Sequence, residues 1–181
     1  MANGLTVLRL ALVPVFVAFL VTGTTAARII AFVIFVAASV TDLLDGRLAR
    51  SRGLITDFGK IADPIADKAL IGSALISLSI LGELPWWVTG LILFREVGVT
   101  VLRFWVIRHG VIPASRGGKL KTLLQVIAIG LYVLPGPPGV VRELVMTAAV
   151  VVTLVTGGDY ALRAARLRRA GTRGIPKDDH G

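Results

Sequence analysis

Four aspartates in the first half of the chain have a spacing that could bind metal ions: Asp42, Asp45, Asp63 and Asp67. The first two are three residues apart and the last two are four residues apart, so each pair would share one face of a helix. The segment between the pairs is short, which predicts two antiparallel neighbouring helices. Carboxylates that converge beside apolar segments repel one another unless a cation lies between them. We therefore expect a divalent metal site here.

The ligand chemistry indicates a hard cation, because neither histidine nor cysteine accompanies these carboxylates. Magnesium and manganese are the expected ions, and they usually bridge protein carboxylates to substrate phosphates. Two such ions could clamp a phosphoryl group during its transfer. A solvated loop whose aspartates cap helices is the simpler alternative. It is disfavoured because Asp63 and Asp67 lie within an apolar segment, where ionisable residues are by default functional.

Three residues around the aspartates fit a phosphate ligand: Gly46, Arg50 and Gly59. Each glycine removes a side chain beside the acidic cluster, which lets a bulky ligand approach the backbone. Arg50 can bind a phosphate through two N–H groups. The alternatives are helix packing for the glycines and anchoring at a membrane surface for Arg50, and the residues alone leave both open.

The rest of the chain has the composition of a membrane protein. Of its 181 residues 55% are hydrophobic, and they form long blocks. The absence of cysteine excludes disulfides, thiolate metal sites and a cysteine nucleophile. The net charge of +9 comes largely from basic residues near the ends of the apolar segments. This distribution favours an anionic membrane surface over nucleic acid as the partner.

We expect an all-α integral membrane bundle of six transmembrane helices, over residues 1–160, followed by a basic cytoplasmic tail over 161–181. The predicted spans are residues 5–21, 26 to about 42, 58–81, 86–107, 119–134 and 140–155. Lysine and arginine collect on one side of these spans, whereas Arg28 and Arg142 lie near turns of the other side. By the positive-inside rule, both termini face the cytoplasm. So does the acidic segment, by which we mean residues 42–67 with their four aspartates.

The aspartates and their neighbours together resemble the signature of a known family. The pattern Asp42-x2-Asp45-Gly46-x2-Ala49-Arg50-x8-Gly59-x3-Asp63-x3-Asp67 looks like the complete motif of the CDP-alcohol phosphotransferases. Six transmembrane helices with a site that faces the cytoplasm are also typical of that family. The resemblance covers nearly the whole chain.

This resemblance implies a metal-dependent enzyme that moves a phosphatidyl or similar group from a CDP-linked donor to an alcohol and releases CMP. The four aspartates would bind two divalent cations, Mg²⁺ or Mn²⁺, that hold the donor pyrophosphate. Asp67 would also be the general base that takes the proton of the acceptor hydroxyl. The residues implied in nucleotide binding are Asn3, Thr6, Gly46, Arg50, Thr56 and Gly59.

Two later segments bear on the identity of the acceptor. Residues 94–103 and 118–122 resemble segments of the phosphatidylglycerophosphate synthases, a subfamily that joins CDP-diacylglycerol to glycerol 3-phosphate. Arginines inside a membrane segment need an anionic partner, which a phosphorylated acceptor would supply. The residues predicted to bind that phosphate are Arg95, Arg103, Lys119 and Lys121. The alternatives are an internal pair with Glu96 or another carboxylate for Arg95 and membrane anchoring for the two lysines.

Other functions remain open at this point. Enzymes of the same fold could use inositol phosphate, or phosphatidylglycerol as in cardiolipin synthase, and a divalent-cation transporter would also need intramembrane carboxylates. A transporter, however, has no need of glycines and an arginine around the acids, and a nucleic-acid binder needs a soluble fold to present its basic residues. The predicted partners are CDP-diacylglycerol, glycerol 3-phosphate and lipid of the cell membrane, with a homodimer expected from the family.

Overall fold

All six expected helices are present, and no strand occurs among the described residues. The computed structural model describes the backbone of residues 2–52, 57–106 and 116–173, and the side chains of residues 7–41, 68–102 and 117–165. The helices are α1 (Ala2–Thr22), α2 (Thr25–Arg52), α3 (Asp57–Ile80), α4 (Trp86–Val106), α5 (Arg116–Val133) and α6 (Gly139–Arg173). The predicted all-α class is therefore confirmed for this part of the chain.

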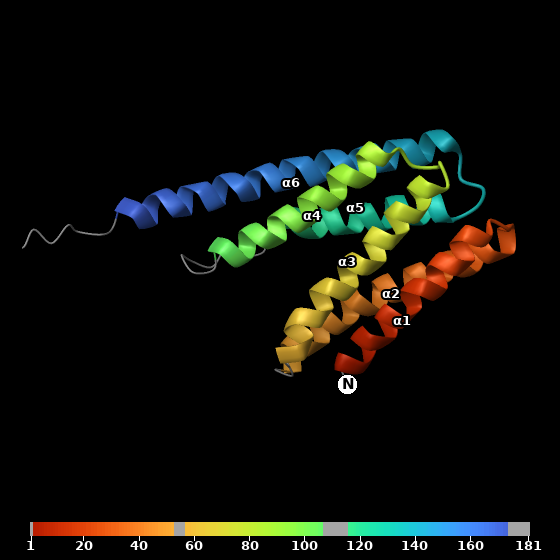
Figure 1. Cartoon of the computed structure of the whole chain (residues 1–181), viewed down its shortest axis with the longest axis horizontal. Helices are drawn as coiled ribbons and strands as arrows, with labels where there is room; N and C mark the ends of the chain where they lie inside the picture. The colour runs from red at the N-terminus through yellow and green to blue at the C-terminus, as the bar shows by residue number, and fades with distance from the viewer. Residues whose placement is uncertain (1, 53–56, 107–115, 174–181) are drawn as a thin grey trace, which may run out of the picture.

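The helices alternate in direction, so that the turns α1–α2, α3–α4 and α5–α6 gather at one end of the molecule (Figure 1, right). We call this the turn end. The N-terminus and the adjoining ends of α2 and α3 lie at the opposite end. α1 packs along α2 and α3, α6 packs along α4 and α5, and α5 also contacts α2 and α3. The acidic segment and the described turns therefore occupy opposite ends of the bundle.

The turns are tight because glycine and proline stand where each helix ends or begins. Gly23 follows α1 with a φ of 75°, and Gly82 follows α3 with a φ of 73°, a conformation that other residues rarely adopt. Pro138 precedes α6 and its carbonyl accepts the Val141 N–H at 3.0 Å. The predicted turn at residues 135–139 is therefore confirmed, and a short turn obliges its two helices to pack as neighbours.

An apolar core connects the helices. Phe16 of α1 and Phe35 of α2 are fully buried, with ring centroids 5.7 Å apart. Leu75 of α3, Ile92 of α4 and Ile129 of α5 are also completely buried. Close packing of such side chains gains van der Waals contacts that hold the helices together, also where the surroundings are lipid.

Two polar pairs cross this core. The Ser79 and Thr89 hydroxyls lie 2.7 Å apart and join α3 to α4. Gln125 Nε2 donates to Thr153 Oγ1 at 3.1 Å and joins α5 to α6. A buried polar group without a partner is costly, so these pairs fix the position of each helix along its neighbour.

Large apolar side chains also cover the outside of every helix. The most exposed examples from each helix are 54–82% exposed: Val7, Val33, Ile80, Phe94, Leu123 and Val140. Such a surface suits lipid chains better than water. Among the described residues, Gly139–Ala165 of α6 is the one stretch both long and apolar enough to cross a membrane, with a mean hydropathy of 1.8. Shorter apolar stretches occur in α1, α2 and α3, so the six-span arrangement stays a prediction.

Three helices extend well beyond their predicted spans. α2 continues past residue 42 to Arg52. α6 continues past residue 155 to Arg173, so the basic tail begins as part of the same helix. Arg163 Nε lies 3.0 Å from Asp159 Oδ2 one turn earlier, a pair that favours this continuation. α5 begins at Arg116, inside a predicted loop. Its first turn contains two glycines, whose low helix propensity explains why a loop was expected there.

A cluster of charged side chains lies at the turn end. Glu83, in the α3–α4 turn, forms an ion pair with Arg28 near the start of α2. Glu83 Oε2 also lies 3.9 Å from Arg142 Nη1 of α6. The Arg142 guanidinium lies over the Tyr132 ring, 5.3 Å from its centroid. Arg28 and Arg142 therefore link α2 and α6 to the turn between α3 and α4.

Replacing Glu83 by alanine should destabilise the fold, because the Arg28 and Arg142 side chains, 14% and 30% exposed, would lose a carboxylate. We expect a loss of about 1–3 kcal/mol, below the cost of breaking a fully buried pair. The measurement is the apparent melting temperature in detergent. Glu143→Ala, at an exposed position on α6, is the matched control. Equal melting temperatures for the two variants would contradict this role of Glu83.

Candidate active site

The four aspartates lie on two neighbouring helices, Asp42 and Asp45 on α2 and Asp63 and Asp67 on α3. Their side chains lie outside the described residues, so their placement rests on the backbone. α2 ends at Arg52 and α3 begins at Asp57, so a link of only four residues keeps these helix ends close together. The two helices contact each other, and α1 packs against both. The predicted antiparallel pair is therefore present.

The helical backbone places the two pairs of aspartates at matching heights. Asp42 lies ten residues before the end of α2, and Asp67 lies ten residues after the start of α3. Asp45 and Asp63 lie seven and six residues from the same two ends. At a rise of about 1.5 Å per residue, one aspartate of each helix is thus ~15 Å from the link and the other is ~10 Å from it. This register is compatible with a metal site shared by the two helices.

The donor set fits hard divalent cations. Four carboxylates at matching heights offer oxygen ligands alone, which is the preference of magnesium and manganese. Elsewhere, the described side chains contain no group of three or more histidine, aspartate or glutamate residues that could hold a metal ion. The acidic pairs of α2 and α3 therefore remain the candidate metal site.

The residues predicted to bind the nucleotide lie at the same end of the bundle. The start of α1 lies beside the end of α2 and the start of α3 (Figure 1). Five of the six predicted positions fall on these three helices: Asn3, Thr6, Gly46, Arg50 and Gly59. The sixth position, Thr56, lies outside the described residues, as do the side chains of the other five. The backbone thus gathers five of the positions without showing their contacts.

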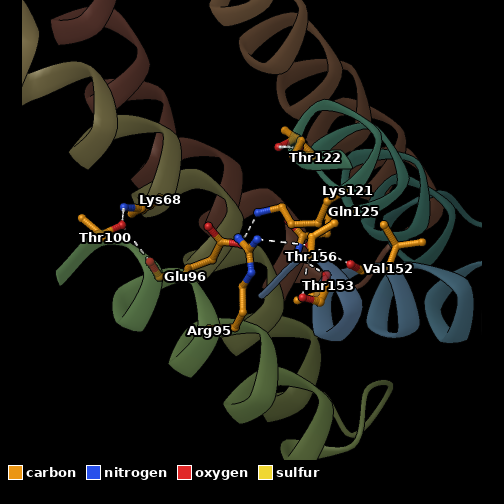
Figure 2. Close-up of polar contacts among 11 residues, drawn as sticks. Lys68, Arg95, Glu96, Thr100, Lys121, Thr122, Gln125, Val152, Thr153 and Thr156 are labelled. Atoms are coloured by element: carbon orange, nitrogen blue, oxygen red, sulfur yellow. Dashed lines mark hydrogen bonds and ion pairs between the residues drawn. The ribbon is translucent and has the colours of Figure 1, made fainter. Parts of the chain in front are cut away.

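Two of the residues predicted to bind the acceptor phosphate meet at Glu96 of α4 (Figure 2). Lys121 of α5 forms an ion pair with Glu96 Oε1, and Arg95 Nη1 lies 3.3 Å from the same oxygen. Lys121 is only 5% exposed. Lys119 is exposed, and Arg103 lies on α4 with its side chain outside the described part. The internal pair considered as an alternative for Arg95 is therefore present.

Arg95 is also held against α6. Its Nη2 donates to Thr156 Oγ1 at 3.1 Å, and the Thr156 hydroxyl donates to the Val152 carbonyl at 2.7 Å. The stem of Arg95 packs on Gly157, where an added Cβ would lie 3.1 Å from Arg95 Cγ. Arg95 therefore links α4 to α6.

Two residues of this region were not predicted from the sequence. Lys68 of α3 donates to Thr100 Oγ1 of α4, and the Thr100 hydroxyl donates to the Glu96 carbonyl at 2.7 Å. Lys68 directly follows Asp67, so this contact connects the acidic helix to α4. A lysine inside an apolar stretch is the signal that could have revealed it.

We call the residues of Figure 2 that lie around Glu96 the polar cluster: Lys68, Arg95, Glu96, Thr100, Lys121 and Thr156. Its described side chains carry three positive charges and one negative charge. The cluster joins four helices, α3 to α6, and adjoins the acidic motif through Lys68. In an apolar interior this excess of positive charge favours a bound anion or neighbouring carboxylates.

The chain belongs to the CDP-alcohol phosphatidyltransferase family, which matches residues 1–155. It is thus a member of an enzyme family, and the family resemblance of the acidic motif is confirmed. A Mycobacterium tuberculosis protein named "Probable phosphatidylglycerophosphate synthase" is 60% identical over 171 residues, covering 92% of this chain and 82% of that protein.

Two further relatives bear the name "CDP-diacylglycerol–glycerol-3-phosphate 3-phosphatidyltransferase". The protein of Rickettsia typhi is 38% identical over 169 residues, which cover 87% of this chain and 93% of that protein. The protein of Bacillus subtilis is 34% identical over 176 residues, which cover 87% of this chain and 91% of that protein. The similarity therefore extends over nearly the full length of these relatives.

Replacing Gly157 by alanine should disturb Arg95, whereas the same change at Gly158 should not. A Cβ at position 157 would lie 3.1 Å from Arg95 Cγ, whereas at position 158 it would have no neighbour within 4 Å. Both variants gain a similar helix propensity, about 1 kcal/mol, so their difference isolates the crowding. We expect a lower apparent melting temperature for Gly157→Ala than for Gly158→Ala. Equal melting temperatures would contradict this prediction, because they would mean that the Arg95 side chain moves aside without loss of stability.

Proposed function

We propose that this protein transfers the phosphatidyl group of CDP-diacylglycerol to glycerol 3-phosphate and releases phosphatidylglycerophosphate and CMP. The observation that carries the chemistry is the matching height of the four aspartates on α2 and α3, within a chain of this enzyme family. The acceptor is supported by relatives that are 60%, 38% and 34% identical and are named for this product or this reaction.

The four aspartates would hold two divalent cations, Mg²⁺ or Mn²⁺, whose charge when bound stabilises the donor pyrophosphate and the departing CMP. Asp67 would accept the proton of the acceptor hydroxyl, since a carboxylate near bound cations stays ionised at neutral pH. The hydroxyl oxygen then bonds to the phosphorus of the phosphatidyl group, and the bond from that phosphorus to the CMP oxygen breaks. CMP leaves with the bonding electrons.

Nucleotide binding is assigned to five positions gathered at the same end of the bundle, Asn3, Thr6, Gly46, Arg50 and Gly59. It is also assigned to Thr56, which lies outside the described residues. The glycines on α2 and α3 leave room for a ligand beside the helix backbone. Arg50 offers two N–H groups to one phosphate. These residues would hold CDP-diacylglycerol with its pyrophosphate at the acidic pairs.

A phosphorylated acceptor suits the charge of the polar cluster. A phosphate monoester carries about two negative charges at neutral pH, which a neutral alcohol lacks. Lys121 is the described residue we assign to this phosphate, because it is a buried cation between α4 and α5. Arg103 and Lys119 are proposed as further contacts. Arg95 would support the site by linking α4 to α6.

We further propose that all six helices cross the cell membrane, with the acidic pairs and both termini on the cytoplasmic side. The apolar outer faces of the helices and their alternating directions support this arrangement. A site near the cytoplasmic boundary can reach a lipid donor in the bilayer and a soluble acceptor in the cytoplasm. A homodimer is proposed from family membership alone.

The reaction is tested by following CMP release from CDP-diacylglycerol with purified protein, Mg²⁺ or Mn²⁺, and several acceptors. We expect release with glycerol 3-phosphate, little with inositol phosphate or phosphatidylglycerol, and none after chelation of the metal. Release with inositol phosphate alone would change the assigned substrate. No release with any acceptor, together with uptake of divalent cations into proteoliposomes, would favour the transporter.

Asp67→Asn should abolish turnover while much of the nucleotide binding persists, because the amide cannot accept the hydroxyl proton. We expect CMP release to fall by roughly 100-fold or more. Binding of the CDP group, measured by calorimetry with Mg²⁺, separates lost chemistry from lost affinity. Asp159→Asn, at an exposed position on α6, is the control. Near-normal turnover of Asp67→Asn would remove its role as the base.

A further inference from the structure

Glu96 lies at the centre of the polar cluster and has no part in the chemistry assigned above (Figure 2). It is on α4, with its side chain 16% exposed, in a stretch that otherwise presents apolar residues such as Phe94 and Val97. A carboxylate inside a membrane bundle is costly and persists where it has a partner and a role. The contacts of Glu96 indicate what that role is.

One atom of Glu96 contacts cations from two helices. Its Oε1 accepts from Lys121 Nζ of α5 and lies 3.3 Å from Arg95 Nη1 of α4. These two cations would repel each other in an apolar interior without a carboxylate between them. Glu96 therefore offsets part of the repulsion between these two cations.

Arg95 is fixed by contacts with α6, and Glu96 contributes to fixing the flexible side chain of Lys121. Arg95 donates to Thr156 at 3.1 Å and packs on Gly157, so its guanidinium is held from α6. Lysine carries its charge on four rotatable carbons. The carboxylate therefore gives the Lys121 ammonium a defined position between α4 and α5.

We infer that Glu96 is a positioning residue for acceptor recognition, which orients Lys121 so that its ammonium meets the phosphate of the acceptor. This inference rests on the proposed function. A cation that is already placed loses less conformational freedom when the phosphate binds, so binding is tighter. Glu96 acts through Lys121 and does not touch the reacting atoms.

A purely structural role would give different kinetics. If Glu96 only fastened α4 to α5, its loss would lower stability and affect both substrates alike. If it positions Lys121, its loss should weaken binding of glycerol 3-phosphate and spare CDP-diacylglycerol. The effect should also disappear once Lys121 itself is removed, since two residues that act through one contact are not additive.

The test measures CMP release by the full chain in detergent with Mg²⁺, with each substrate varied in turn. Glu96→Gln keeps the shape of the side chain but removes its charge, and we expect the KM for glycerol 3-phosphate to rise roughly tenfold. The KM for CDP-diacylglycerol should stay within about twofold, a shift well below 1 kcal/mol. Glu96→Asp, which restores the charge, should recover part of the affinity and covers the case in which the glutamine variant folds poorly.

A second comparison uses Lys121→Met, in which Glu96→Gln should add less than about twofold to the KM for glycerol 3-phosphate. Asp159→Asn breaks an exposed ion pair with Arg163 and is the control, with kinetics like those of the wild type. An unchanged KM in Glu96→Gln, an equal rise for both substrates, or full additivity with Lys121→Met would overturn the inference. A wild-type protein that releases no CMP with glycerol 3-phosphate would instead refute the proposed function on which it rests.

Discussion

Charged groups inside an apolar bundle must find partners at the same height, and this constraint governs the arrangement of the helices. Asp42 and Asp45 match Asp63 and Asp67 along α2 and α3 because the link between these helices is only four residues long. Glu96 likewise matches Lys121 because α4 and α5 both pack on α6 and α3. A shift of one helix by a single turn, about 5.4 Å, would break these matches. The tight turns and the buried hydroxyl and amide pairs prevent such a shift.

The fold class and the helix positions could be predicted because long apolar blocks are interrupted by glycine and proline. Pro135 to Gly139 is an example, since a turn is the only structure that this composition allows. The length of α6 could not be predicted in the same way. After residue 155 the apolar pattern ends, but alanine, leucine and arginine are good helix formers and the helix continues to Arg173.

The acidic motif could also be identified from the sequence, because spacings of three and four residues define one face of a helix. The polar cluster could be identified only in part. Which carboxylate meets Lys121 depends on how α4 and α5 pack on α3 and α6, and no local pattern contains that information. The same holds for the contact of Arg95 with Thr156, 61 residues later in the chain. The contact of Lys68 with Thr100, 32 residues later, depends in the same way on how α3 packs against α4.

The length of α6 has a consequence for how the protein would sit in a bilayer. Its 35 residues make a helix of about 52 Å at ~1.5 Å per residue, whereas the hydrocarbon layer is only ~30 Å thick. The surplus lies at its C-terminal end, where Arg163 begins a series of arginines that prefer lipid phosphates to hydrocarbon. The arginines would keep this end of α6 in the headgroup layer. They would thereby fix the depth of the bundle in the bilayer and hold the acidic pairs at the level of the headgroups of the lipid donor.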